Sequence, residues 1–127
     1  MLRKRCFFYS GIRRLVLPSS VRIIDVGAFT LCGSLEYADL SVARNVRTLE
    51  SGTFLGCKKL RYVLLNDGLE TIGCQCFSQT GLEEVVIPGS VTCVGGNAFY
   101  LSTSLKCVRF LGSSESRVHS EFKLPEK

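Results

Sequence analysis

Seven cysteines are the residues of this chain best suited to metal or redox chemistry. The closest pair is Cys74 and Cys76, which are separated by one residue, and this pair is the feature that favours a thiol-redox function. A zinc site needs further cysteine or histidine ligands at suitable spacings, and no such partners stand near this pair. Because the number of cysteines is odd, at least one thiol is left unpaired.

Acid–base and nucleophilic chemistry has no centre in this sequence. The single histidine, His119, lies in a polar C-terminal stretch where no predicted element fixes a cysteine or serine beside it. Gly95-Gly96-Asn97 is not followed by a helical pattern, which a phosphate-binding loop requires. We therefore predict that the chain is not an enzyme and has no catalytic, cofactor-binding or metal-binding residues.

The charge pattern and the apolar runs exclude two further classes of function. The net charge is +5, but the basic residues are spread along the chain except at residues 3–5 and at Arg13-Arg14, so we predict no nucleic-acid partner. The uncharged stretch from Val85 to Leu105 is interrupted by Pro88 and by the Gly95-Gly96-Asn97 cluster, so we predict no membrane span. The N-terminus has a basic start, but its apolar run is too short for a signal peptide.

A repeat organises the chain and positions these residues. In the segment from Leu82 to Leu105, apolar residues occur at offsets that reappear in the segment from Ile12 to Leu35. The periods are equal, since 105 − 82 = 23 and 35 − 12 = 23. A fixed period in the twenties with constant apolar offsets predicts a leucine-rich-repeat solenoid, which is placed with the α/β folds by convention.

Applying the same template to the whole chain gives about four full repeats of 22 to 25 residues. The predicted solenoid covers residues 1–111, and residues 112–127 are predicted to be a degenerate cap or a flexible tail. Within each repeat we expect a short parallel β-strand followed by turns and brief helical segments. The predicted units are a partial N-terminal repeat 1–11, full repeats 12–34, 35–59, 60–81 and 82–104, and a last strand 105–111.

The repeat predicts where the core lies. One phenylalanine per unit should point inward and stack on its counterparts in the neighbouring coils, which gives a row of Phe7, Phe29, Phe54, Phe77 and Phe99. Cys32 and Cys57 share one column of the repeat, and Cys6 and Cys76 share another, so we expect these four as small buried residues. Cys32 and Cys57 lie in adjacent coils, which leaves a disulfide between them as an alternative.

The outward positions of the predicted strands are the candidate binding site. A column of alternating sign, Arg13, Glu36, Arg61, Glu83 and Lys106, is interpreted as a self-neutralising ladder. Two neighbouring columns combine aromatic, apolar and charged side chains that the core does not need, as protein-binding surfaces do. Scattered exposed apolar residues without a function are the alternative. The candidate residues are Arg14, Tyr37, Asp39, Tyr62, Leu64, Glu84, Val86 and Arg109.

The motifs of the repeat resemble a known type. Ile87-Pro88-x-Ser90-Val91 followed by Ala98-Phe99, and Leu17-Pro18-Ser19-Ser20-Val21 followed by Ala28-Phe29-x-x-Cys32, are similar to BspA-like leucine-rich repeats, over about residues 6–110. The second and third units lack the proline, and Ser102 replaces the cysteine in the fourth. The resemblance implies a non-catalytic adhesion or protein-binding role at the cell surface or in secreted form.

These observations predict a non-catalytic module that binds a protein partner, or a glycan, through its exposed strand face. The cell-surface or secreted location rests on the resemblance, and the missing signal peptide leaves a cytoplasmic location open. One alternative is a fragment of a longer repeat protein without independent activity. A thiol-redox protein is the other, and it depends on Cys74 and Cys76 alone.

Overall fold

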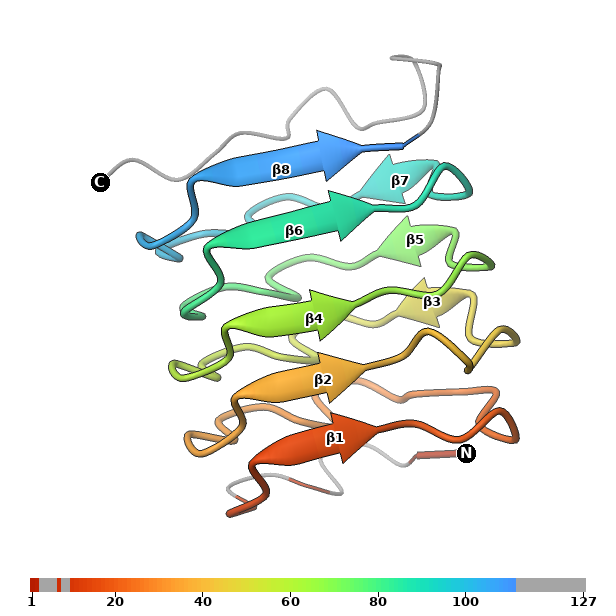
Figure 1. Cartoon of the computed structure of the whole chain (residues 1–127), viewed down its shortest axis with the longest axis horizontal. Coiled ribbons are helices and arrows are strands. Elements are labelled where there is room, and N and C mark those ends of the chain that lie inside the picture. Colours follow the sequence, from red (N-terminus) through yellow and green to blue (C-terminus); the bar gives the residue numbers. More distant parts are fainter. Residues whose placement is uncertain (3–6, 8–9, 112–127) are drawn as a thin grey trace.

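The structure is a computed structural model that describes residues 1–2, 7 and 10–111. Most of the expected partial repeat 1–11 and the whole expected cap 112–127 therefore lie outside the described residues. The described chain forms a stack of coils whose short strands pair in parallel with those of neighbouring coils on two sides of the stack (Figure 1). The predicted solenoid of short parallel strands is confirmed.

One sheet contains the strands that the repeat predicts, at one position in each coil. The alternation of inward and outward side chains in these segments favours extended backbone that is buried on one side. Successive strands lie side by side and are parallel (Figure 1). They are β1 (Arg14–Val16), β2 (Tyr37–Asp39), β4 (Tyr62–Leu64), β6 (Glu84–Ile87) and β8 (Cys107–Phe110).

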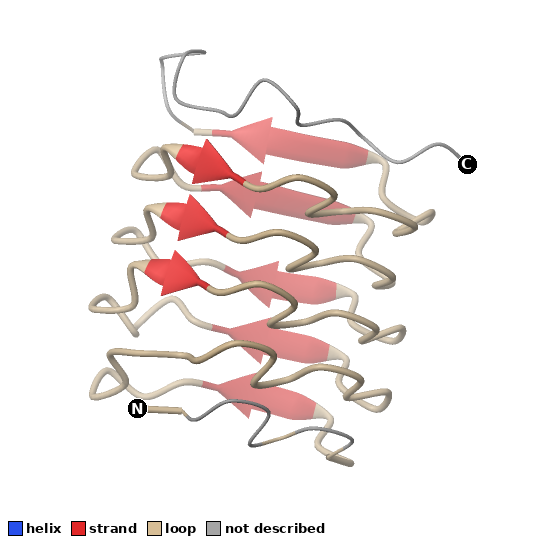
Figure 2. Cartoon of the chain, turned by 180° about the vertical axis from the view of Figure 1, so that it is seen from behind, coloured by secondary structure: helices blue, strands red, loops and turns tan. Residues whose placement is uncertain are grey.

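A second sheet lies on the opposite side of the coils, where the sequence analysis expects turns or brief helical segments. It contains the two-residue strands β3 (Thr48–Leu49), β5 (Thr71–Ile72) and β7 (Cys93–Val94), which pair in parallel (Figure 2). Among the described residues no segment is helical, so the expectation of brief helical segments is wrong. No helix in this part of the chain could therefore cross a membrane.

The two sheets differ in continuity. The ladder of β3, β5 and β7 is unbroken, whereas the larger sheet divides into β1-β2-β4 and β6-β8. Within the described chain no ladder of backbone hydrogen bonds joins β4 to β6, and Figure 1 shows a wider spacing between these two strands than between their neighbours. The two coils that contain β4 and β6 are thus not paired at these strands, while they remain paired through β5 and β7 on the other side.

A row of stacked phenylalanines runs through the core of the coils, as predicted. The ring of Phe29 stacks on those of Phe7 and Phe54, with centroids 5.0 and 5.5 Å apart and interplanar angles of 8°. Phe77 continues the row, at 5.5 Å from Phe54 and 5.5 Å from Phe99. The row from Phe29 to Phe99 is buried together with inward leucine, isoleucine and valine side chains of every coil. Burial of one such ring stabilises the fold by about 1.5 to 3 kcal/mol.

Two residues with a left-handed backbone conformation flank the phenylalanine in each of four coils. They turn the chain before and after the buried ring. The residue two before the ring has a positive φ in four coils: Gly27, Gly52, Gln75 and Asn97. The residue two after the ring also has a positive φ: Leu31, Gly56, Gln79 and Leu101. At Gly56, whose φ is 75°, an added Cβ would also meet Cδ2 of Leu31, so that side chain would have to shift.

The longest repeat accommodates its extra residues in a turn. Residues 41–45 form two consecutive turns between β2 and β3, and Ala43 is buried between them. The backbone N–H groups of Ala43 and Val46 donate to the carbonyl oxygens of Leu40 and Ala43. Because the insertion closes on itself, β2 and β3 keep their register with β4 and β5.

Candidate protein-binding face

The outward side of β1, β2, β4, β6 and β8, here called the strand face, carries all eight candidate residues. Side chains of a strand alternate between the two faces of its sheet, and the central residue of each strand points inward. Ala38, Val63 and Val85 are buried accordingly. The residues on either side of them point outward and form two columns that cross the strands.

The first column is Arg14, Tyr37, Tyr62, Glu84 and Cys107. The register pairs Arg14 with Tyr37, Tyr37 with Tyr62, and Glu84 with Cys107. Tyr62 is 63% exposed, whereas Tyr37 is half-buried beneath the guanidinium of Arg14, whose Cζ lies 4.6 Å from the ring centroid. Stacking of this kind restrains an otherwise flexible arginine while the N–H groups at the rim of the guanidinium stay available.

The second column is Val16, Asp39, Leu64, Val86 and Arg109, again in register along each ladder. Val16 is 57% exposed and Leu64 is 46% exposed, so neither is needed by the core. The Nη1 of Arg109 lies 3.8 Å from the carboxylate of Glu84, which belongs to the first column. Apolar and aromatic side chains are therefore bordered by charged ones on a rigid sheet.

Two shallow depressions hollow the strand face. The first has a volume of about 580 Å³ and lies over β1, β2 and β4. The second, of about 740 Å³, lies where the ladder is interrupted between β4 and β6, and its walls include Tyr62, Leu64 and Val86. The first depression is lined by Arg13, Arg14, Glu36, Tyr37, Arg61 and Tyr62.

The column of alternating sign is neutralised in only one half. Glu83 lies 3.7 Å from Arg61 and 3.8 Å from Lys106, so one carboxylate serves both cations. None of the ion pairs within the described chain involves Arg13, Arg14 or Glu36. The interpretation as a self-neutralising ladder thus holds for the part beside β6 and β8 and is wrong for the part beside β1 and β2.

Asp39 has local partners that hold it in its charged form. Its Oδ1 accepts hydrogen bonds from the hydroxyl and the backbone N–H of Ser41, at 2.6 and 2.9 Å. The Ser41 hydroxyl, followed by the Ser41 backbone N–H, lowers the pKa of the Asp39 carboxyl below its usual value. The strand face therefore keeps a fixed negative charge next to Leu64 at neutral pH.

The described cysteines are buried or exposed, except for Cys93, which is half-buried. Cys32, Cys57 and Cys76 are buried, which confirms their assignment to the core, and Cys6 lies outside the described residues. Cys32 and Cys57 are free thiols, so the alternative of a disulfide between them is wrong. Cys74 is exposed while its neighbour Cys76 is buried, and burial raises the pKa of the Cys76 thiol. The described residues contain no group of three or more potential ligands that could hold a metal ion.

Sequence reasoning missed a second role of the Cys32 and Cys57 column. The Sγ of Cys32 donates to the carbonyl oxygen of Phe7, and that of Cys57 donates to the carbonyl oxygen of Phe29. Ser102, at the same offset in the fourth coil, donates its hydroxyl to the carbonyl oxygen of Phe77. The signal in the sequence is a small residue with a donor group three positions after each phenylalanine.

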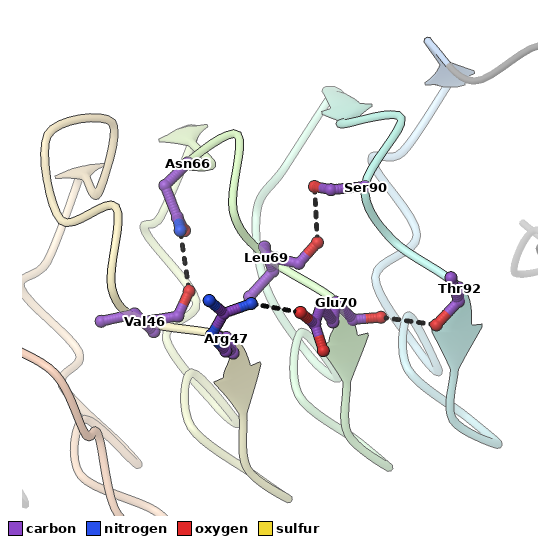
Figure 3. A network of polar contacts seen from close by, with 7 residues as sticks. All are labelled: Val46, Arg47, Asn66, Leu69, Glu70, Ser90 and Thr92. Atoms are coloured by element: carbon purple, nitrogen blue, oxygen red, sulfur yellow. Dashed lines mark hydrogen bonds and ion pairs between the residues drawn. The ribbon is translucent and has the colours of Figure 1, made fainter.

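Polar contacts also join the coils on the side of the second sheet (Figure 3). Ser90 donates its hydroxyl to the carbonyl oxygen of Leu69, and Asn66 donates its amide to that of Val46, at 2.6 and 2.8 Å. Arg47 and Glu70 form an exposed ion pair between adjacent coils. The charge of Arg47 is thus paired with a carboxylate, whereas Arg13 and Arg14 on the strand face take part in none of the ion pairs of the described residues.

The fold and the strand face together define a class, the leucine-rich-repeat proteins with a non-helical second side. The chain belongs to the BspA type leucine-rich repeat family, since residues 1–122 match that repeat region in six copies. Among the curated proteins searched, none matches this chain.

Solved structures of bacterial proteins share this fold. A leucine-rich repeat protein from Bacteroides ovatus is 34% identical with a TM-score of 0.72, and the match covers 77% of this chain and 25% of that one. The Treponema pallidum leucine-rich repeat protein is 32% identical with a TM-score of 0.76, covering 83% and 49% of the two chains. A leucine-rich cell surface protein from Faecalibacterium prausnitzii is 24% identical with a TM-score of 0.64, covering 87% and 36%, and shows similarity of fold alone. The chain thus spans a quarter to a half of the length of these proteins.

Proposed function

We propose that this chain is a non-catalytic binding module whose strand face holds a protein partner. The observation that carries the proposal is the placement of Tyr37 and Tyr62 side by side on adjacent parallel strands, with Tyr62 63% exposed. Tyrosine supplies a large apolar surface and a polar hydroxyl at a small cost in side-chain entropy, and it is enriched at the energetic centres of protein interfaces.

The surroundings of the two tyrosines support a protein partner. Leu64 and Val16 add exposed apolar area, and Arg14, Asp39, Glu84 and Arg109 surround it with charges of both signs. An apolar centre inside a charged border is the usual composition of a protein interface. The inward side chains of the sheet belong to the same buried core as the phenylalanine row, so the strands are already fixed. Their backbone therefore loses little conformational freedom when a partner binds.

The family membership is consistent with the proposal, because leucine-rich repeats generally mediate protein interactions. A glycan is the second candidate ligand, since an exposed tyrosine ring such as that of Tyr62 can also stack on the apolar face of a sugar. The two ligand classes are separated by the same experiment.

The test immobilises the whole purified chain and measures binding of a panel of purified extracellular proteins and a panel of glycans by interferometry. The double variant Tyr37→Ala, Tyr62→Ala should weaken binding of a protein hit at least about tenfold, because hot-spot aromatics contribute 2 kcal/mol or more. Tyr100→Ala is the matched control, since Tyr100 is 51% exposed but lies beside the Phe99 turn, away from the strand face.

Three results would contradict the proposal. The chain could bind no protein of the panel, it could bind glycans alone, or its protein hit could bind the double variant and the wild type equally. A loss of binding in Tyr100→Ala equal to that of the double variant would place the interface on the turn side.

A further inference from the structure

Unneutralised positive charge gathers in one half of the strand face. The part beside β6 and β8 contains Glu83, Glu84, Lys106 and Arg109, and all four take part in ion pairs. The depression over β1, β2 and β4 contains three arginines and one glutamate, which gives a local charge of 3 − 1 = +2. Of these arginines, only Arg61 takes part in an ion pair within the described chain.

The side chains of this depression are arranged for an anion next to an apolar group. The guanidinium of Arg14 lies over the Tyr37 ring, so one of its sides is occupied but the N–H donors at its rim remain available. Such a fixed guanidinium binds a carboxylate with two parallel hydrogen bonds and loses little entropy in doing so. The neighbouring Tyr62 offers an exposed ring to an apolar side chain.

The spacing of the arginines suggests how a ligand would lie. Arg13 and Arg61 belong to coils that are separated by the coil of β2, so their positions are about two strand spacings, or about 10 Å, apart. A peptide in the extended polyproline II conformation rises about 3.1 Å per residue with three residues per turn, so side chains three residues apart lie on the same side of it and are separated by a similar distance. A peptide that crosses the strands could place one carboxylate at Arg13 and Arg14 and a second at Arg61.

We propose that this depression binds an extended acidic peptide segment of the protein partner, with two carboxylate side chains three residues apart and an apolar residue between them. This inference rests on the proposed function and specifies the chemistry of the partner. Glu36, which lies between the arginine positions, limits the affinity by repelling the ligand.

The test measures fluorescence anisotropy of a labelled synthetic peptide, Gly-Ser-Glu-Leu-Ser-Glu-Gly-Ser, on titration with the whole chain. We expect binding that weakens by about tenfold when sodium chloride is raised from about 50 to 500 mM, because exposed charges are screened. The same peptide with glutamine in place of glutamate, or with lysine in place of glutamate, should bind at least about tenfold more weakly.

Single substitutions test whether each charge strengthens or weakens binding of the peptide. Arg13→Gln and Arg14→Gln should each weaken binding about fivefold, and Glu36→Gln should strengthen it about threefold. Arg47→Gln is the matched control, because it removes the same charge from the opposite side of the coils, where Arg47 is paired with Glu70. Its affinity for the peptide should stay within about twofold of the wild type.

The outcomes separate this inference from the proposed function. If the chain holds a protein through Tyr37 and Tyr62 but does not bind the peptide at about 1 mM, the acidic-peptide inference is wrong and the proposed function stands. Equal weakening by Arg13→Gln and Arg47→Gln would reduce the effect to net charge and overturn the site. Binding of a sulfated oligosaccharide in preference to the peptide, or weaker binding by Glu36→Gln, would overturn it as well. Peptide binding that follows the arginine variants, without a protein hit that depends on the tyrosines, would support this site and contradict the proposed function as stated.

Discussion

The thiol of Cys57 donates a hydrogen bond to the carbonyl oxygen of Phe29, across 3.1 Å and between adjacent coils. Both groups are buried, so this carbonyl has no access to water. Cys32 makes the same contact in the preceding coil, and Ser102 makes it in the fourth coil. The column is therefore defined by a small side chain with a donor group, and sulfur itself is not required.

This relationship predicts the effect of two substitutions at position 57. Cys57→Ser retains a donor and should change the free energy of unfolding by less than about 1 kcal/mol, as the natural Ser102 suggests. Cys57→Ala removes one of the two hydrogen bonds that the Phe29 carbonyl oxygen accepts, the other being donated by the backbone N–H of Cys32, and should cost about 1 to 2 kcal/mol. Urea unfolding followed by circular dichroism measures both values. An alanine variant as stable as the serine variant would show that the hydrogen bond contributes nothing.

The phenylalanine row predicts a large loss of stability at its centre. The ring of Phe54 contacts Phe29 and Phe77 at centroid distances of 5.5 Å on both sides, and the residue is fully buried. Phe54→Ala should therefore cost about 3 to 5 kcal/mol, because it removes the transfer energy of the ring and leaves a cavity. Tyr100→Ala, at an exposed position, should stay within about 0.5 kcal/mol. Thermal unfolding measures the difference, and similar melting temperatures for the two variants would contradict the stacked core.

The repeat made the strands of the strand face, the phenylalanine row and the outward columns predictable from the sequence. Each depends on a property that recurs at every period: an alternation of two residues within a strand, or one large apolar side chain at a constant offset. Phe29, Phe54, Phe77 and Phe99 lie in one row because stacking of equivalent positions follows from the repeat alone.

Features that depend on differences between repeats were not predictable. Side-chain rotamers cannot be read from the residue types of a repeat column. They determine that Arg14 stacks on Tyr37 and that Arg13 and Glu36 form no ion pair with each other. The interruption between β4 and β6 depends on how two neighbouring coils pack on one another. Two-residue strands such as β5 are also too short for an alternation to be recognised.

The left-handed positions predict that one substitution by glycine will stabilise the fold. Gln75 is exposed and has a φ of 57°, in the column where other coils carry Gly27 and Gly52. Gln75→Gly should raise the free energy of unfolding by up to about 1 kcal/mol, because a side chain at positive φ is strained by more than the entropy that glycine loses. Lys59→Gly, at an exposed position without positive φ, should lower it by about 0.5 to 1 kcal/mol. Equal destabilisation by both variants in urea titrations would contradict this account of the turn.

The two groups of cysteines predict two stages of labelling by a thiol reagent. Cys74 and Cys107 are exposed and should react at once in the folded protein, whereas Cys32, Cys57 and Cys76 should react only after unfolding. Peptide mapping by mass spectrometry after timed alkylation distinguishes the sites. Rapid labelling of Cys76 together with Cys74 would contradict its burial and revive the thiol-redox alternative.

Burial of Cys76 also predicts a dependence of stability on alkaline pH. Burial raises the pKa of this thiol above its ordinary value of about 9, so the folded state keeps the proton that the unfolded state releases. The stabilising contribution is complete below about pH 9 and is lost as the pH rises above it. Cys76→Ala, compared with the wild type in urea titrations between pH 8 and about 10.5, should flatten this decline. An identical decline in both proteins would assign it to other groups.

The contact between Ser41 and Asp39 predicts an acid-side effect of the opposite sign. The hydrogen bonds from Ser41 lower the pKa of Asp39 below its ordinary value of 3.8, so the folded state releases a proton more readily than the unfolded state. The resulting stabilisation is present above about pH 4 and is lost as the pH falls through the lowered pKa. Ser41→Ala should move the pKa of Asp39 upward, although the backbone N–H of residue 41 stays in place, so the shift should be partial. Titration of the side-chain carboxyl by carbon-detected NMR measures it, with Ser90→Ala, two coils away, as the control. An unchanged pKa in Ser41→Ala would show that the hydroxyl does not hold the Asp39 charge beside Leu64.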